Sequence, residues 1–303
     1  MNGPSTSGLP RTAGGPIFLL GITGRSGTNY VRDLIALHPD CEKARSPIWE
    51  DFFLHEAAPL FEFERKVRSH WKSWNAAEVG SELLPRVGAA LLAFLSEGVE
   101  RRVIAKTPSV RNLERFFDLF PNAYLVIIVR DPRSVVYSAV ASFKADAEGW
   151  ARDWVKGATA IASLQDDPRA EHKRFHVVRY EDLVTNGRST ITELLRFLDL
   201  GQTEFNFGAA ADLPPRGSSQ LAGTGEMHWR PTQSPGAFEP LRRWEAWPES
   251  ELERIEWISS PHMDRFGYVP VTAAHRPWLH RVRDAALLSR LAMRQIGGRL
   301  RRR

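Results

Sequence analysis

The chain has 303 residues, of which 43% are hydrophobic and 25% charged, and its formal net charge is +5. This length and composition predict a soluble protein with one large domain, and the single cysteine, Cys41, excludes an internal disulfide and fits a reducing cytosol. The nine histidines lack metal-ligand spacing, and the longest apolar run, 87–95, is too short to span a bilayer, so we expect a cytoplasmic protein without a metal site.

Residues 1–15 do not resemble a signal peptide, and their composition predicts a flexible leader. From residue 16 onward, short apolar runs alternate with segments of helical periodicity. This alternation predicts an α/β domain over residues 16–270, with a central parallel sheet flanked by helices in three layers. The expected strands are 16–21, 102–105, 123–129 and 174–179, and the expected helices are 28–38, 81–99, 110–120, 132–146, 150–165 and 189–198.

A glycine-rich segment, 21–28, joins the first expected strand to the first expected helix and reads Gly-Ile-Thr-Gly-Arg-Ser-Gly-Thr. A glycine-rich turn at a helix N-terminus offers backbone N–H groups and the positive end of the helix dipole to an anion. Arg25, Ser26 and Thr28 add side-chain donors suited to phosphate or sulfate. The segment is not a Walker A loop, because Ser26 stands where the second glycine belongs and no lysine follows.

A second polar segment follows the apolar run 125–129, which reads as a buried parallel strand. Asp131 and Pro132 are typical of a helix N-cap and first helical position, so Asp131 is interpreted as a cap. Arg130 then lies at the end of the strand and Ser138 lies two turns into the next helix. Both are expected to point into the crevice where open α/β sheets bind nucleotides.

At these residues the sequence resembles sulfotransferases that use 3′-phosphoadenosine 5′-phosphosulfate (PAPS) and release 3′-phosphoadenosine 5′-phosphate (PAP). The resemblance covers about residues 16–268 and includes Ala-Lys-Thr-Pro at 105–108 and Val-Arg-Tyr-Glu-Asp-Leu at 178–183. It implies a P-loop-like fold and a bacterial member nearer the tyrosylprotein and carbohydrate branches than the cytosolic small-molecule branch. The donor-binding residues that it implies, with the late polar segment included, are Gly24, Arg25, Ser26, Gly27, Thr28, Asn29, Arg130, Ser138, Tyr180, Ser218, Ser219, Trp229 and Arg230.

The resemblance also implies the catalytic residues. Lys106 aligns with the catalytic lysine of the family, so Lys106 and Arg25 are expected to stabilise the leaving oxygen of an in-line transfer. The histidine that small-molecule sulfotransferases use as the base is absent, because Pro108 occupies that position. Glu50 matches the glutamate that serves as the base in the other branches, while Asp51 and His55 are alternatives because a base is assigned by geometry first.

The segment 206–248, rich in Gly, Pro, Ser and Trp, is interpreted either as a lid over PAPS or as irregular packing, and the resemblance favours the lid. Residues 271–303 form a basic tail, in which Gly297 and Gly298 are expected to interrupt a helix. Residues 275–303 hold nine arginines and one aspartate. This helix either contacts an anionic membrane or acidic partner peripherally, or packs on the domain with its arginines in water.

The sequence therefore predicts transfer of a sulfuryl group from PAPS, without a metal, to an acceptor hydroxyl of a small molecule, glycan, lipid or peptide. A P-loop-type nucleotide kinase and an inactive PAP-binding interaction protein are the alternatives. No nucleic-acid partner is expected.

Overall fold

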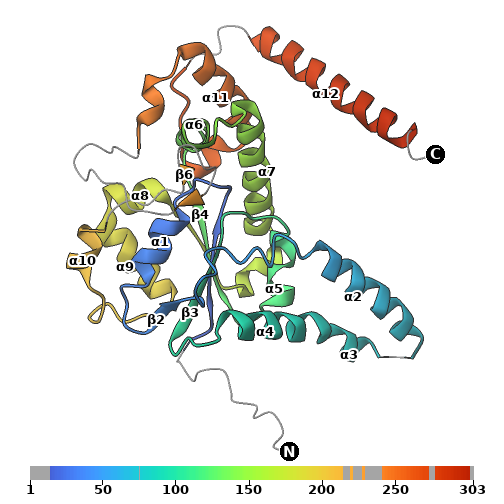
Figure 1. The fold of residues 1–303 in the computed structure, drawn as a ribbon, viewed down its shortest axis with the longest axis vertical. Helices are drawn as coiled ribbons and strands as arrows, with labels where there is room; N and C mark the ends of the chain where they lie inside the picture. The colour runs from blue at the N-terminus through green and yellow to red at the C-terminus, as the bar shows by residue number, and fades with distance from the viewer. Residues whose placement is uncertain are drawn as a thin grey trace, which may run out of the picture.

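Five parallel strands form the central sheet of the computed structural model (Figure 1), which describes residues 14–74, 76–213, 219–220, 227–228, 241–272 and 277–300. The strand order is β2-β3-β1-β4-β5. The four predicted strands are confirmed within two residues at each end, and β2 at the sheet edge was missed. The bounds are β1 (Ile17–Gly21), β2 (Cys41–Lys43), β3 (Arg102–Thr107), β4 (Tyr124–Val129) and β5 (Phe175–Arg179), and a separate antiparallel pair joins β6 (Ser219–Gln220) to β7 (Met227–His228).

Helices connect the strands of the sheet and continue after the last of them. They are α1 (Thr28–Ile35), α2 (Ala58–Trp71), α3 (Ala77–Ser81), α4 (Leu83–Leu95), α5 (Phe116–Leu119), α6 (Pro132–Phe143), α7 (Ala147–Gln165), α8 (Tyr180–Thr185), α9 (Gly187–Phe197), α10 (Phe207–Ala211), α11 (Glu249–Met263) and α12 (Pro277–Leu300). The helix predicted over 110–120 is wrong in extent, because only a 3₁₀ turn (Leu113–Arg115) and the single turn of α5 form there.

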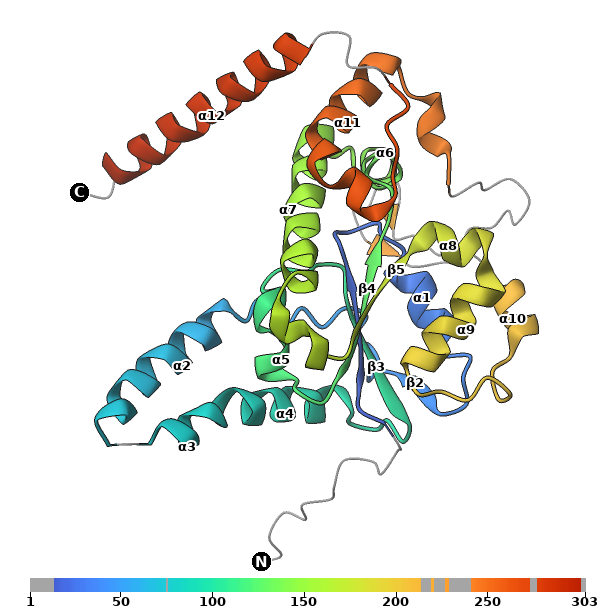
Figure 2. The same ribbon diagram turned by 180° about the vertical axis from the view of Figure 1, so that it is seen from behind.

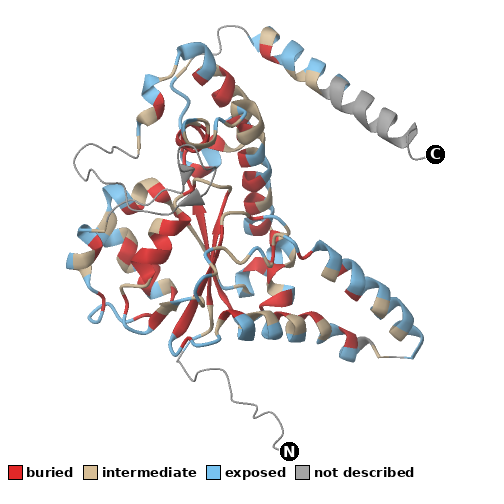
Figure 3. Cartoon of the chain, in the orientation of Figure 1, coloured by how far each residue is buried: buried red, intermediate tan, exposed pale blue. Residues whose placement is uncertain are grey.

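The helices cover both faces of the sheet, which gives the predicted three layers (Figures 1 and 2). Successive strand residues point to opposite faces, so Phe18 and Leu20 enter one core while Ile17 and Leu19 enter the other. The first core is completed by α2, α4, α5 and α7, and the second by α1, α8 and α9. Burial on both faces explains why β1, β3 and β4 are buried along their whole length (Figure 3).

Parallel strands bring their carboxyl ends to one edge of the sheet, where the predicted motifs follow them. The glycine-rich segment follows β1, Lys106 lies near the end of β3, Arg130 follows β4, and Tyr180 follows β5. The topology therefore brings these four motifs to one side of the sheet.

The C-terminal helix α12 extends away from the sheet beside α11 (Figure 2). It runs through Gly297 and Gly298 to Leu300, so the predicted interruption at these glycines is wrong. In the part of the chain that the structure describes, no helix is long and apolar enough to cross a membrane.

Candidate active site

The loop between β1 and α1 is held by its own backbone and by one buried hydroxyl. Arg25 and Gly27 have positive φ angles of 69° and 95°, so the chain turns sharply before the helix. The Ser26 Oγ donates to the carbonyl of Thr23 at 2.6 Å and lies 3.3 Å from the Thr23 nitrogen, which donates to it. Ser26 is 1% exposed, so its hydroxyl closes the loop from inside.

Two glycines of this loop lie against large aromatic rings. A Cβ at Gly27 would lie 2.3 Å from Cδ2 of Tyr180, and one at Gly24 would lie 2.9 Å from Cη2 of Trp150. Tyr180 is 3% exposed, so its ring supports the loop from below as a core anchor would. Its predicted contact with a nucleotide stays a prediction. Packing therefore favours glycine at both positions, and at Gly27 the positive φ favours it as well.

The N-terminus of α1 begins directly at the end of this loop. Gly27 is the N-cap residue, and no side chain caps the first turn. Thr28 and Asn29 begin the helix, and both are buried. The first N–H groups of an α-helix have no partner within the helix, so this end of α1 can bind an anion.

A cationic cluster lies beside the same loop. The Arg25 Nε donates to the Oγ of Ser138 at 2.9 Å, and its Nη2 donates to the Oγ of Ser142 at 3.1 Å. The Nη1 of Arg130 donates to the Arg25 carbonyl at 3.0 Å, and the Arg130 guanidinium lies 4.4 Å from the centre of the Tyr180 ring. Arg25, Arg130 and Ser138 therefore lie together beside the loop.

The positive charge of this cluster affects the pKa of Arg25. Burial lowers its pKa from 12.5 to about 10, with further lowering by the charges of Arg130 and Arg243. Arg243 comes from the turn Arg243–Ala246, far along the chain, and sequence reasoning missed it. Three converging cations match a ligand with several negative charges, because an anion there would offset the repulsion between them.

Lys106 lies in a second cluster on the neighbouring strand. Its Nζ donates to the Oδ1 of Asn29 at 2.6 Å and to the Oε1 of Glu50 at 2.9 Å. The Lys106 side chain is 1% exposed, whereas that of Glu50 is 20% exposed. Burial lowers the pKa of Lys106, and the charge of Glu50 partly restores it. The side-chain hydrogen bonds described for Arg25 are with Ser138 and Ser142 on α6, in the first cluster rather than beside Lys106.

Asp51 and His55 are placed differently from Glu50. The Asp51 N–H donates to the Lys106 carbonyl at 3.1 Å, and its Oδ1 accepts from the Phe53 nitrogen at 3.0 Å. Burial raises the pKa of the Asp51 carboxyl. The Nδ1 of His55 lies 2.7 Å from the Oγ of Ser109. Of the three candidate bases, Glu50 is the one whose side chain accepts a hydrogen bond from the Lys106 ammonium among the described contacts.

The segment after β4 is held by a buried ionic network. Asp131 caps α6 by accepting from the Arg133 nitrogen at 2.8 Å, which confirms its interpretation as a cap. Its own N–H donates to the Oε1 of Glu181 at 3.0 Å, so the residue after Arg130 is tied to the first turn of α8. The indole of Trp154 donates to the Arg130 carbonyl at 2.8 Å. The bonds from Trp154 and to Glu181 hold the two ends of the peptide group between Arg130 and Asp131, so they fix the backbone directly after the cationic side chain.

Several predicted residues cannot be located. Ser218, Trp229 and Arg230 lie outside the described residues, and Ser219 is described only as part of the backbone of β6. Among the residues that are described, no group of three or more His, Cys, Asp or Glu side chains is arranged to hold a metal ion.

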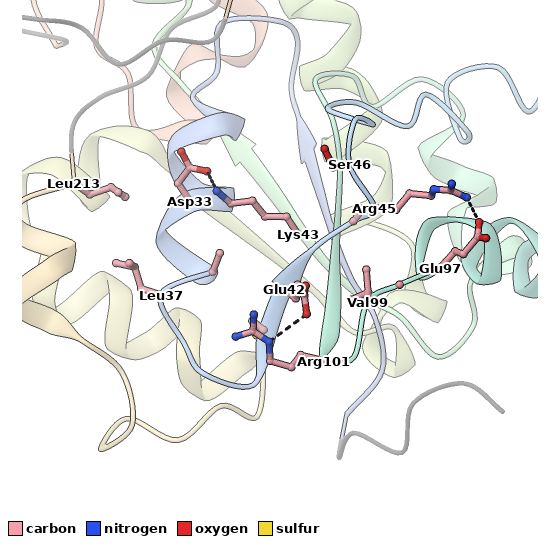
Figure 4. A pocket seen from close by; sticks show the side chains of 14 residues that line it. Asp33, Leu37, Glu42, Lys43, Arg45, Ser46, Glu97, Val99, Arg101 and Leu213 are labelled. Atoms are coloured by element: carbon pink, nitrogen blue, oxygen red, sulfur yellow. Dashed lines mark hydrogen bonds and ion pairs between the residues drawn. The ribbon is translucent and has the colours of Figure 1, made fainter. Parts of the chain in front are cut away.

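A separate pocket of about 680 Å³ lies along the edge strand β2 (Figure 4). Its charged side chains pair across it: Lys43 with Asp33 at 2.7 Å, Arg101 with Glu42 at 3.2 Å, and Arg45 with Glu97. Because these pairs balance in charge, the pocket does not match a highly charged anion as the loop after β1 does.

Comparison with known proteins places the chain among sulfotransferases. A model of the Sulfotransferase family matches residues 16–204. The chain is 24% identical over 270 residues to protein-tyrosine sulfotransferase 1 of Danio rerio, covering 84% of this chain and 73% of the relative. It is 26% identical over 204 residues to the protein-tyrosine sulfotransferase of Drosophila melanogaster, covering 61% of this chain but only 38% of the relative's length.

A solved structure shows the same fold. The sulfotransferase domain from the Synechococcus PCC 7002 olefin synthase has a TM-score of 0.53 and 21% identity, covering 86% of this chain and 97% of that chain. This likeness supports the α/β sulfotransferase fold. Because the family model also matches more than half of the sequence, the chain belongs to the sulfotransferase family.

Proposed function

We propose that the chain transfers a sulfuryl group from PAPS to an acceptor hydroxyl, with Glu50 as the base and Lys106 at the leaving oxygen. One observation carries this proposal above all. The Lys106 ammonium is buried and contacts both Asn29, at the start of the anion-binding helix, and Glu50, which is partly exposed. A donor for the leaving group and an acceptor for the proton therefore meet at one point.

The residues of this chain fit the donor molecule. The loop from Gly24 to Thr28 and the free first turn of α1 would hold the 5′-phosphosulfate. Arg130 and Ser138 would hold the 3′-phosphate, with Arg243 as a further cation beside Arg25. The glycine contacts with Trp150 and Tyr180 support this fit, because they let the loop backbone lie where no side chain could intervene.

When bound, PAPS supplies an activated sulfuryl group whose departure leaves negative charge on a phosphate oxygen. Lys106 stabilises that charge, and its buried position makes its interaction with an oxyanion stronger than it would be in water. Glu50 accepts the proton of the acceptor hydroxyl through a carboxylate oxygen. Its contact with Lys106 orients the carboxylate and opposes the lowering of the Lys106 pKa by burial.

The first experiment measures melting temperature with PAP in EDTA and with ATP and magnesium. PAP should stabilise the chain without a metal, since arginines and helix N–H groups provide the positive charge. A larger shift with ATP and magnesium would favour the nucleotide kinase instead. Absence of any shift with PAP would contradict the donor site.

The second experiment tests turnover. The purified chain is incubated with ³⁵S-labelled PAPS and either cell extract or a tyrosine peptide, the latter because two similar proteins are named protein-tyrosine sulfotransferases. We expect a labelled acceptor, and we expect Glu50→Gln to abolish transfer while PAP affinity persists. PAP binding without transfer to any acceptor would leave the inactive PAP-binding protein as the better interpretation. Normal transfer by Glu50→Gln would move the base to Asp51 or His55.

A further inference from the structure

The first turns of α12 are docked on the body of the protein by one of their faces. His280 is 3% exposed, stacks on Trp257 with ring centres 5.2 Å apart, and lies 3.1 Å from the Oε1 of Glu253. Asp284 accepts from the Nη2 of Arg254 at 2.5 Å and from the indole of Trp257 at 3.0 Å. All of these partners belong to α11, so α11 fixes the rotation of α12 about its own axis.

The opposite face of the same turns is apolar and faces solvent. Trp278 is 64% exposed and Val282 is 57% exposed. Ala285, Ala286 and Ser289 follow on this face and are also exposed. Because the docked face already carries His280 and Asp284, the exposed tryptophan and valine are not needed to hold the helix in place.

Arginines border the exposed apolar face. With 100° of rotation per residue, Arg281 lies at one edge of the face formed by Trp278 and Val282, and Arg283 lies at the opposite edge. Both arginines are exposed. The sequence keeps this period, because Met293, Ile296 and Leu300 follow Ser289 at steps of four, three and four residues. Residues 275–303 contain nine arginines and one aspartate, and that aspartate is paired with Arg254.

We propose that the outer face of α12, defined by Trp278, Val282, Ala285, Ala286 and Ser289, lies on an anionic lipid surface. An apolar strip with a tryptophan, bordered by arginines, matches the boundary between lipid headgroups and acyl chains. The arginines meet the negative headgroups while the strip enters the apolar layer. The docked face meanwhile keeps the enzyme attached to the helix, so the catalytic domain is carried to the surface. This inference does not rest on the donor or acceptor proposed above.

Charge favours this occupant over a second copy of the chain. Pairing two outer faces would bring the arginine borders of one copy against those of the other, and like charges at such contacts repel. A membrane with anionic lipids instead provides negative charge along the whole length of the helix. An acidic protein partner remains an outcome of the test, because it would share the salt dependence but would not need lipid.

The test is co-sedimentation of the full chain with vesicles of phosphatidylcholine alone or of phosphatidylcholine and phosphatidylserine at three to one. The chain should pellet with the anionic vesicles and be released by salt. Arg281→Gln combined with Arg283→Gln should weaken binding about 30-fold at low salt, following the usual attraction of basic residues to such surfaces. Trp278→Ser combined with Val282→Ser should weaken it about tenfold or more.

A matched control changes the same residue types elsewhere. Trp74 and Val79 are 71% and 63% exposed near the α2–α3 connection, so Trp74→Ser combined with Val79→Ser removes a similar apolar surface. This variant should pellet like the unaltered chain, and melting temperature should be similar in every variant. Equal loss in the control, equal binding to both vesicle types, or no pelleting would overturn the proposal. Concentration-dependent dimerisation abolished by Trp278→Ser with Val282→Ser would assign the face to self-association instead.

Discussion

Replacing Gly27 by alanine tests whether the loop between β1 and α1 is shaped by the Tyr180 ring beside it. Gly27 has a φ of +95°, and a Cβ there would lie 2.3 Å and 2.6 Å from two ring carbons of Tyr180. The substitution thus combines backbone strain with a steric clash. Gly98 offers a matched control, because its φ is +75° while a Cβ there would meet nothing within 4 Å.

The two substitutions separate the two costs. Holding an L-residue in the left-handed region costs about 1–2 kcal/mol, and overpacking a filled site costs about 1–3 kcal/mol. Gly98→Ala carries only the first cost, whereas Gly27→Ala carries both and should lower the free energy of unfolding by about 2–5 kcal/mol. Because the loop must also shift away from Tyr180, Gly27→Ala should lose PAP affinity, and Gly98→Ala should keep it.

Urea unfolding gives the free energies, and calorimetric titration with PAP gives the affinities. The double variant Gly27→Ala with Tyr180→Leu should recover part of the stability, since a smaller side chain leaves room for the added methyl group. Equal free energies of unfolding for Gly27→Ala and Gly98→Ala would refute the claim that Tyr180 fills the space below the loop. PAP affinity unchanged in Gly27→Ala would separate the loop from the donor site.

Three further predictions concern the charged groups. Lys106→Met should spare PAP affinity but lower turnover about a hundredfold or more in a PAPS-based assay, because a donor used in the transition state is lost. Arg243→Ala should weaken PAP binding about tenfold in calorimetry, because one cation beside the anion is lost. The melting temperature of the free protein should not fall, because the variant also removes the repulsion between Arg243 and Arg25. Burial raises the pKa of Asp51 above its usual 3.8, so above that value the folded state holds a proton that the unfolded chain releases. Stability should therefore fall as pH rises through this window, and urea unfolding should show a smaller fall in Asp51→Asn.

The sheet could be predicted from the sequence because its strands are continuous apolar runs buried on both faces. The run Leu-Val-Ile-Ile-Val at 125–129 has no polar break, and the structure places it inside β4. The edge strand β2 has three residues, Cys41, Glu42 and Lys43, of which two are charged. A short edge strand is buried on fewer sides, so its composition does not distinguish it from a loop.

The site could be predicted where one segment carries the chemistry, and not where distant segments meet. The Arg25 and Arg130 motifs were found because each follows a strand directly. Arg243 was missed because it lies in a late 3₁₀ turn far from the other cations in the sequence. The pair Arg242 and Arg243 is a signal of local positive charge, but it does not indicate which site the charge faces. The positive φ of Arg25, followed by contacts with Ser138 and Ser142, is likewise a product of the folded loop that no spacing reveals.

The helix α7 contacts both the loop after β1 and the segment after β4, and these contacts fix how the two lie relative to each other. On α7, Trp150 lies against Gly24, Trp154 donates to the Arg130 carbonyl, and Gly157 leaves room for the Ile22 carbonyl, which would lie 2.2 Å from a Cβ there. These three residues are four and three positions apart, so they share one face of the helix. The loops after β1 and after β4 therefore rest on the same rigid surface, and the spacing of the cations on these loops depends on α7 as much as on the strands that precede them.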